Sequence, residues 1–133
     1  MKIKCLGAVG NVTGSRFLVE TGKSRLLIDC GLYQEREFRA RNWERFPVKP
    51  SGIQHVLLTH AHIDHCGYLP KLIKDGFNGS IFCTPPTSEI AKISLLDSAH
   101  LQDRQFLFFF IRKLRAPAFF ETFHGLFMLF YLF

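Results

Sequence analysis

The sequence has few cysteines and no closely spaced cysteine pair. The four cysteines of the 133-residue chain lie far apart, at Cys5, Cys30, Cys66 and Cys83. A zinc ribbon needs paired Cys-x-x-Cys motifs and a disulfide-rich domain needs denser cysteines, so both classes are excluded. The first ten residues also lack the long apolar run of a secretory signal. A reducing cytoplasm is therefore the expected location.

Length and charge limit the class of protein further. At 133 residues the chain is long enough for one domain with its own core and too short for two ordinary ones. An apolar fraction of 47% is typical of a globular protein, and a charged fraction of 21% excludes a disordered charged tail. The net charge of +6 suits a polyanionic partner such as RNA, although many soluble proteins are mildly basic.

Phenylalanine is distributed very unevenly along the chain. Residues 1–105 hold five of the 15 phenylalanines, and 106–133 holds the other ten without a helical or strand period. Three interpretations are open: a membrane-associated segment, an extra helix packed on the core, or a stretch unrelated to the preceding domain, such as a translated shifted frame. We prefer the third, because such an aromatic strip would promote aggregation of a soluble protein. We therefore expect a domain at 1–105, an unrelated tail at 106–133 and no membrane association.

The apolar pattern of the first part predicts a run of strands followed by alternating strands and helices. Strands are predicted at 3–9, 15–20, 25–29, 55–59 and 79–84, and helices at 65–77 and 86–102. The turn at 21–24 would join the second and third strands into a hairpin. Thr87 or Ser88 is expected to cap the last helix. Its apolar stripe would comprise Ile90, Ile93, Leu96 and Leu101. This order predicts an α/β layered domain with a mixed sheet.

Four groups that bind metals are crowded into one short loop. They are His60, His62, Asp64 and His65, between a predicted strand and a predicted helix. Sites of open α/β sheets lie at this C-terminal end of a strand. His60 and His62 alternate along an extended segment, so both can reach one ion, while the other two can face a second ion. Imidazole and carboxylate ligands suit Zn²⁺ or Mn²⁺, and Zn²⁺ is the first choice.

A pair of ions on this loop would supply hydrolytic chemistry. Two such ions about 3.5–4 Å apart would hold a bridging water and lower its pKa toward about 7, which provides hydroxide at neutral pH. Asp64 is the candidate catalytic residue, because it is well placed to orient that hydroxide. The alternative is a polar loop that carries histidines by chance, which the spacing of four ligands disfavours.

The segment THAHIDH at 59–65 resembles the His-x-His-x-Asp-His signature of the metallo-β-lactamase superfamily. The resemblance implies that His60 and His62 ligate one zinc ion, and that Asp64 and His65 ligate the other. Members of the superfamily also carry an aspartate at the end of an earlier strand, where LLIDCG places Asp29. The resemblance gives Asp29 a supporting role through hydrogen bonds; a carboxylate that caps a turn is the alternative.

Four further stretches resemble the β-CASP RNA-processing nucleases of that superfamily. They lie at 12–20, 28–35, 62–87 and 95–102, so the resemblance covers about residues 3–103. It implies a metal-dependent hydrolase with two zinc ions that cleaves RNA phosphodiester bonds as an endonuclease or 5′-exonuclease. A thioester- or lactone-hydrolysing member of the superfamily is the alternative enzyme, which the stretches VTGS and DSAH disfavour.

Other residues that the family needs lie beyond the region of resemblance. A third histidine completes the first metal site in the family, and a later aspartate bridges the two ions. We therefore expect the N-terminal half of the family's αββα sandwich, truncated, with one apolar face of its sheet uncovered. His100 is expected to be a surface or interdomain residue rather than a ligand. Such a fragment would hydrolyse RNA weakly or not at all, or serve as a non-catalytic chain that binds metal, a partner or a second copy of itself.

Overall fold

The computed structural model of the chain describes residues 1–99. The predicted tail at 106–133, its boundary with the domain and the expected role of His100 lie outside the described residues. These three expectations therefore stay predictions. None of the helices in residues 1–99 is long and apolar enough to cross a membrane.

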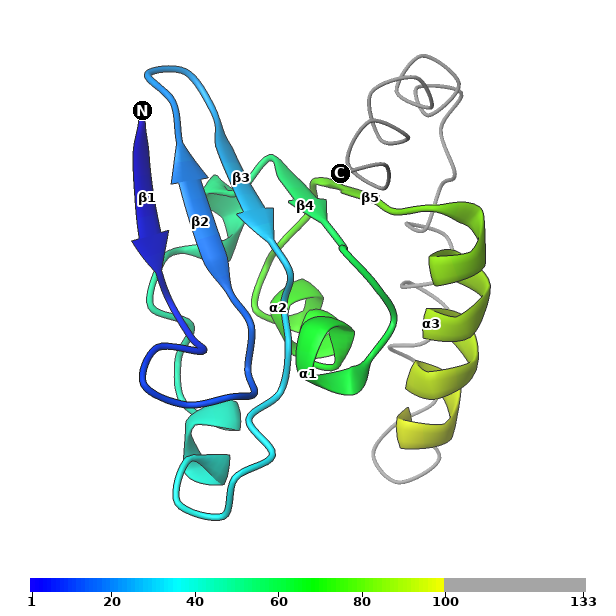
Figure 1. The fold of residues 1–133 in the computed structure, drawn as a ribbon. Helices are drawn as coiled ribbons and strands as arrows, with labels where there is room; N and C mark the ends of the chain where they lie inside the picture. The colour runs from blue at the N-terminus through cyan, green and yellow to red at the C-terminus, as the bar shows by residue number, and fades with distance from the viewer. Residues whose placement is uncertain (100–133) are drawn as a thin grey trace, which may run out of the picture.

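Five strands form one mixed sheet. They are β1 (Lys2–Cys5), β2 (Phe17–Glu20), β3 (Arg25–Ile28), β4 (His55–Leu57) and β5 (Ser80–Phe82), and their order in the sheet is their order in the chain (Figure 1). β1, β2 and β3 pair antiparallel, and β3, β4 and β5 pair parallel. The predicted hairpin of β2 and β3 and the predicted mixed sheet are both confirmed.

The helices leave the C-terminal ends of the parallel strands. They are α1 (Ile63–Cys66), α2 (Leu69–Lys74) and α3 (Pro85–Ala99), with short 3-10 turns η1 (Arg39–Asn42) and η2 (Pro50–Gly52). The single helix predicted at 65–77 is two short helices. Pro70 lies in the first turn of α2, as predicted. Because proline lacks an N–H, a helix running through Pro70 would lose its hydrogen bond to Cys66.

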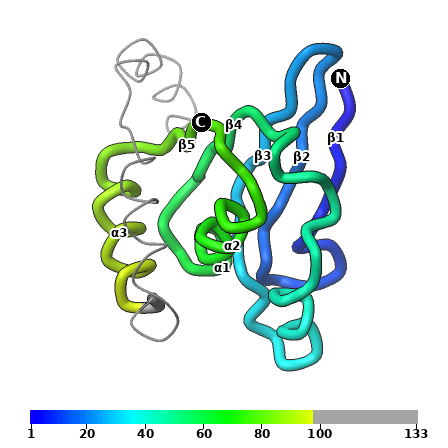
Figure 2. The backbone as a smooth tube through the Cα atoms, turned by 180° about the vertical axis from the view of Figure 1, so that it is seen from behind, coloured from blue at the N-terminus to red at the C-terminus, as the bar shows by residue number. Residues whose placement is uncertain are grey.

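The core lies between the sheet and the helices. Leu18, Leu27, Val56 and Ile81 stand in one row across neighbouring strands and are fully buried or nearly so. Leu69 and Leu72 of α2 belong to the same buried cluster. The neighbouring row, formed by Phe17, Ile28, Leu57 and Phe82, alternates to the opposite face of the sheet and is only partly buried. α3 lies beyond β5, as Figure 2 shows from behind, and it contacts α1.

The start of α3 differs from the prediction. The helix begins at Pro85, and the hydroxyl of Thr84 accepts a hydrogen bond from the N–H of Thr87 at 3.3 Å. Thr87 and Ser88 lie inside the helix and are buried. The prediction that one of them is the cap was therefore wrong, because two prolines can occupy the first turn of a helix and move its start toward the N-terminus.

The buried face of α3 also differs from the prediction. Ile90 and Ile93 are 55% and 67% exposed, whereas Ala91 and Leu95 are buried. Of the other two residues of the predicted stripe, Leu96 is half-buried and Leu101 lies outside the described residues. Both sets of residues fit a helical period, so the pattern alone could not choose between them. The packing of α3 on the rest of the fold, which includes a contact with α1, decides the face.

Arg16 is a buried cation that holds two loops together. Its side chain is 2% exposed, and its Nε and Nη2 donate to the carbonyl of Gly31 at 2.9 and 2.7 Å. Its guanidinium lies 4.0 Å from the ring centre of Tyr68 and 4.9 Å from that of Tyr33. The aromatic rings and the carbonyl stabilise the buried charge. The residues after β3 are therefore fastened to those between α1 and α2.

Glu35 fastens the loop before β2 to the chain after β3. Its Oε1 accepts the N–H groups of Val12 and Thr13 at 3.0 and 2.9 Å, and its Oε2 accepts the hydroxyl of Thr13. The Thr13 hydroxyl and then its N–H lower the pKa of the Glu35 carboxyl from 4.5 to about 2. A carboxyl with a lowered pKa in the folded state stabilises the fold above its unfolded pKa.

Replacing Glu35 should change how stability depends on pH. We expect Glu35→Gln to be less stable than the wild type at neutral pH. Because protonation of Glu35 removes the same interactions, the difference should shrink as the pH falls from about 4.5 toward about 2. Urea unfolding midpoints measured across this pH range would check the expectation, with exposed Glu37→Gln as the matched control. A difference between Glu35→Gln and wild type that is the same at every pH would contradict it.

Candidate metal centre

The loop after β4 carries His60 and His62, and Asp64 and His65 lie in the first turn of α1, which backbone hydrogen bonds join to the loop after β3. Cys30 N–H donates to the carbonyl of His65 at 2.7 Å, and Leu32 N–H donates to the carbonyl of Ile63 at 3.1 Å. The N–H of Ser15 donates to the carbonyl of Asp64 at 2.9 Å. Since β3 and β4 are parallel, these loops meet at one edge of the sheet (Figure 1). The fold thereby brings Asp29 and residues 60–65 to the same place.

His60 and His62 form the first donor pair. The Nε2 of His60 lies 3.2 Å from the Nδ1 of His62. Two nitrogens bound to one tetrahedral zinc ion, each about 2.0–2.1 Å from it, are about 3.3 Å apart. The spacing of this pair therefore fits two ligands of a single ion.

Asp64 and His65 form the second donor pair. The Nε2 of His65 lies 3.5 Å from Oδ2 of Asp64, and its Nδ1 lies 2.8 Å from Oδ2 of Asp29. The two pairs are adjacent, because the rings of His60 and His65 have their centres 3.8 Å apart. Asp29 thus holds the ring of His65 from behind and leaves its other nitrogen facing Asp64.

Asp29 is the hub of the hydrogen bonds behind the loop. It is 3% exposed and has a φ of 57°, a left-handed conformation that aspartate tolerates better than most residues. Its Oδ1 accepts the N–H and the hydroxyl of Thr59 at 2.9 and 3.0 Å. Its Oδ2 accepts the hydroxyl of Ser15 at 3.3 Å and lies beside His65. Both oxygens are engaged by protein groups, which is the arrangement of a supporting residue rather than of a ligand.

Two supporting residues were missed by the sequence analysis. The hydroxyl of Thr59 bonds Asp29 and also lies 3.0 Å from Nδ1 of His60, so it contacts both the support and a candidate ligand. Ser15 bonds Asp29 from the loop before β2. The position of Thr59 directly before His60 was the only available signal for it. Ser15 lies in the stretch VTGS, which the sequence analysis used only as evidence for the family resemblance.

Burial tunes the protonation of the groups at this edge. It lowers the pKa of His60, and the nearby His65 and His62 lower it further, which favours the neutral imidazole that binds metals. Burial also raises the pKa of Cys30 and of Cys66 to about 12. These two thiols therefore stay protonated at neutral pH, and neither supplies a thiolate ligand.

The donor chemistry fits a divalent ion, while the number of donors is low. Within residues 1–99, no three histidine, cysteine, aspartate or glutamate side chains already surround a common ion position. The donors stand instead as two pairs, each with its atoms close enough to share an ion. Histidine nitrogens with a carboxylate suit Zn²⁺ or Mn²⁺. A catalytic zinc ion usually has three protein ligands and a water, so each pair accounts for part of a site.

Comparison with known proteins places these residues in a family. The sequence model described as the metallo-beta-lactamase superfamily matches residues 9–109. Ribonuclease TTHA0252 from Thermus thermophilus is 42% identical over 106 residues, which are 80% of this chain and 24% of the ribonuclease. Transcription termination factor FttA from Methanosarcina mazei is 38% identical over 101 residues, 73% of this chain and 16% of the factor. Among solved structures, the Rm3 metallo-beta-lactamase is 24% identical, with a TM-score of 0.47, over 65% of this chain and 31% of that one.

The match takes in well over half of the chain and includes the loop at 59–65 and Asp29. The chain spans about a quarter of the length of the ribonuclease and about a sixth of that of the termination factor. The predicted partial metallo-β-lactamase fold and the resemblance to the RNA-processing β-CASP branch are confirmed by these matches. The chain belongs to the metallo-β-lactamase superfamily.

Proposed function

We propose that residues 59–65 are the metal-binding part of a hydrolase centre that acts on RNA phosphodiester bonds. The observation that carries the proposal is the convergence of two donor pairs at one edge of the sheet. The two nitrogens of the first pair are 3.2 Å apart, and the nitrogen and oxygen of the second pair are 3.5 Å apart. Membership of the superfamily implies a divalent metal; zinc as that metal, and two ions, are part of the proposal. A relative named as a ribonuclease, 42% identical, supports RNA as the substrate.

Each of the four metal-binding residues has a proposed role. His60 and His62 would hold one ion, and Asp64 and His65 the other. A pair of bound divalent ions supplies hydroxide at neutral pH. Asp64 would orient that hydroxide.

The supporting residues set which atoms the histidines present. The Asp29 carboxylate at Nδ1 of His65 favours a proton on that nitrogen. The Nε2 of His65 is then unprotonated and can bind a metal ion. The hydroxyl of Thr59 at Nδ1 of His60 leaves Nε2 of that ring facing His62. A rotation of either ring would cost these hydrogen bonds.

A second function, binding metal without catalysis, is favoured by one specific observation. The described residues supply two donors for each ion, fewer than the three protein ligands of a typical catalytic zinc site. We therefore expect purified 1–133 to bind zinc and to cleave RNA slowly or not at all. The full activity of a relative such as the ribonuclease, of which this chain spans 24%, would need further residues.

Zinc binding and RNA cleavage by the purified chain test the proposal together. Zinc content would be measured by titration against a chromophoric chelator, and cleavage with an end-labelled single-stranded RNA. We expect bound zinc, and the loss of any RNA cleavage in Asp64→Ala. The matched control is Asp97→Ala, which removes an exposed aspartate of α3 and should leave both readouts unchanged.

The outcomes separate the two functions. Bound zinc with no detectable cleavage would favour the non-catalytic function, and Asp64-dependent cleavage would favour the hydrolase. Strong cleavage by 1–133 would contradict the expectation of weak activity. Absence of zinc binding would overturn both functions, and faster hydrolysis of a thioester or lactone than of RNA would overturn the proposed substrate.

A further inference from the structure

The segment after β3 carries the only tryptophan of the chain, Trp43. The backbone on both sides of it is fastened to buried residues. The Asn42 side chain accepts the N–H of Tyr33 at 2.9 Å and donates to its carbonyl at 2.8 Å. The carbonyl of Glu44 accepts the hydroxyl of Tyr68 at 3.1 Å. Since Tyr33 and Tyr68 are both buried, the core sets the position of Trp43.

The side chain of Trp43 nevertheless points outward. It is 68% exposed, whereas Phe46 in the same segment is 4% exposed and lies 5.6 Å, ring centre to ring centre, from Tyr68. A tryptophan on the surface forgoes a large apolar burial. Its indole is thus presented to solvent from a backbone that is hydrogen-bonded on both sides to buried tyrosines, which is the form of a stacking platform for a nucleic-acid base.

Exposed arginines flank Trp43 along the segment. Four exposed arginines lie within seven residues of it, at Arg36, Arg39, Arg41 and Arg45. Two of them are oriented by the protein, because Nε of Arg39 donates to the carbonyl of Gln34 at 3.0 Å and the guanidinium of Arg41 lies 4.7 Å from the ring centre of Phe38. Exposed carboxylates in the same stretch are fewer, at Glu37 and Glu44. The surface therefore combines an aromatic face with an excess of cations, as strand-binding grooves do.

This segment is linked to the loop of the proposed metal centre through two buried residues. Nη2 of Arg16 lies 3.5 Å from Oδ1 of Asn42 and 2.7 Å from the carbonyl of Gly31. Gly31 in turn packs on Asp64, since a Cβ at Gly31 would lie 1.5 Å from the Asp64 carbonyl oxygen. Arg16 and Gly31 thus link Asn42, the neighbour of Trp43, to Asp64. In Figure 1 the segment lies at the same edge of the sheet as the connection from β4 to α1.

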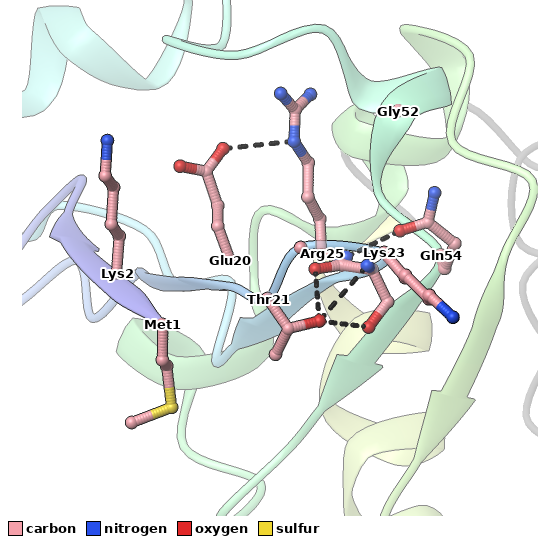
Figure 3. Close-up of a pocket in the computed structure, with 10 residues that line it drawn as sticks. Met1, Lys2, Glu20, Thr21, Lys23, Arg25, Gly52 and Gln54 are labelled. Carbon is pink, nitrogen blue, oxygen red and sulfur yellow. Dashed lines mark hydrogen bonds and ion pairs between the residues drawn. The ribbon is translucent and has the colours of Figure 1, made fainter.

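Within residues 1–99, a second basic surface lies at the opposite edge of the sheet, around the turn between β2 and β3 (Figure 3). Its lining includes Lys2, Lys23 and Arg25 and contains no aromatic residue. The carboxylate of Glu20 lies 3.0 Å from Nε of Arg25 and 2.7 Å from Nζ of Lys4, so part of the charge is paired. This hollow therefore has no aromatic face for stacking, and some of its cations are paired with a carboxylate. A substitution in it can serve as a control for general charge.

We propose that residues 36–45 are a docking surface for single-stranded RNA. The indole of Trp43 stacks on one base, and the guanidinium groups of Arg36 and Arg45 contact phosphates of the same strand. The inference rests on the proposed function, because it delivers the strand to the loop at 59–65. It adds that the strand is held by residues outside that loop.

Binding of RNA by the full chain without metal tests this surface. EDTA removes metal-dependent cleavage, and the probe is a short fluorescein-labelled single-stranded RNA followed by anisotropy. Emission of Trp43 reports stacking directly, because the chain has no other tryptophan. We expect RNA to quench this emission. Trp43→Ala should weaken binding about 5- to 150-fold, the range for loss of one stacked base, whereas Trp43→Phe should keep most of the affinity.

The salt dependence separates phosphate contacts from general charge. Arg36→Ala and Arg45→Ala should each reduce the slope of log affinity against log salt by about 0.7, the value for one phosphate of a single strand. The matched control Lys23→Ala removes a cation at the opposite edge and should leave the slope unchanged. A duplex of the same sequence should bind more weakly, because its bases are already stacked.

Three results would overturn the docking surface: binding of Trp43→Ala that equals wild type, no quenching of Trp43, or a loss in Lys23→Ala as large as in Arg36→Ala. Failure of the proposed function looks different. RNA bound at Trp43 without any zinc binding would contradict only the proposed metal centre. Asp64-dependent cleavage for which Trp43→Ala has the same KM as wild type would contradict only the proposed docking surface.

Discussion

Gly31→Ala is expected to destabilise the fold and to displace the candidate ligand Asp64. A Cβ at Gly31 would lie 1.5 Å from the carbonyl oxygen of Asp64 and 2.0 Å from its carbonyl carbon. Both are backbone atoms, so no side-chain rotation relieves the clash. The same carbonyl accepts the N–H of Ser15, which would be strained as Asp64 moves. Overpacking typically costs about 1–3 kcal/mol, and a clash with fixed backbone falls at or above the upper end, about 3 kcal/mol.

Urea unfolding and zinc titration measure the two effects of Gly31→Ala separately. We expect a lower unfolding midpoint and weaker zinc binding by the fraction that stays folded. The matched control is Gly22→Ala at the turn between β2 and β3, where an added Cβ meets no atom within 4 Å. It should change stability by less than about 1 kcal/mol. Equal unfolding midpoints for Gly31→Ala and wild type would contradict the close contact with Asp64.

His62→Ala is expected to cause a large loss of zinc affinity without loss of the fold. Its Nδ1 lies 3.2 Å from Nε2 of His60, and the substitution leaves His60 without its partner in the first donor pair. Removing an outer partner of a metal ligand typically costs about 10–100-fold in affinity. Loss of a ligand atom should cost more than that. Because His62 is exposed, the core is not affected.

His55→Ala is the matched control for the loss of an imidazole. His55 is also exposed and begins β4, at the end of the strand opposite to the loop, with its ring 5.3 Å from that of Phe82. Chelator competition should give the wild-type zinc affinity for His55→Ala, and circular dichroism should show all three proteins folded. A zinc affinity of His62→Ala equal to that of wild type would refute the assignment of the first donor pair.

Local patterns in the sequence were sufficient for the elements and for the loop. The Thr-Gly-Lys-Ser turn between two apolar runs predicted the hairpin of β2 and β3, because turn chemistry acts over four residues. The four donor residues within 60–65 predicted a metal loop after a strand, and the structure has β4 directly before them. The resemblance to the metallo-β-lactamase superfamily implied a supporting role for Asp29, and Oδ2 of Asp29 lies 2.8 Å from Nδ1 of His65.

Only the tertiary structure decided which residues surround that loop. The burial of Arg16, the contact of Gly31 with Asp64 and the bonds from Ser15 and Thr59 to Asp29 join residues far apart in the chain. No periodicity encodes such contacts, because they depend on the pairing of β3 with β4 and on the approach of their loops. The buried face of α3 was misjudged for the same reason. Identity and order of the elements follow from short-range preferences, whereas burial and support at the site follow from how those elements pack.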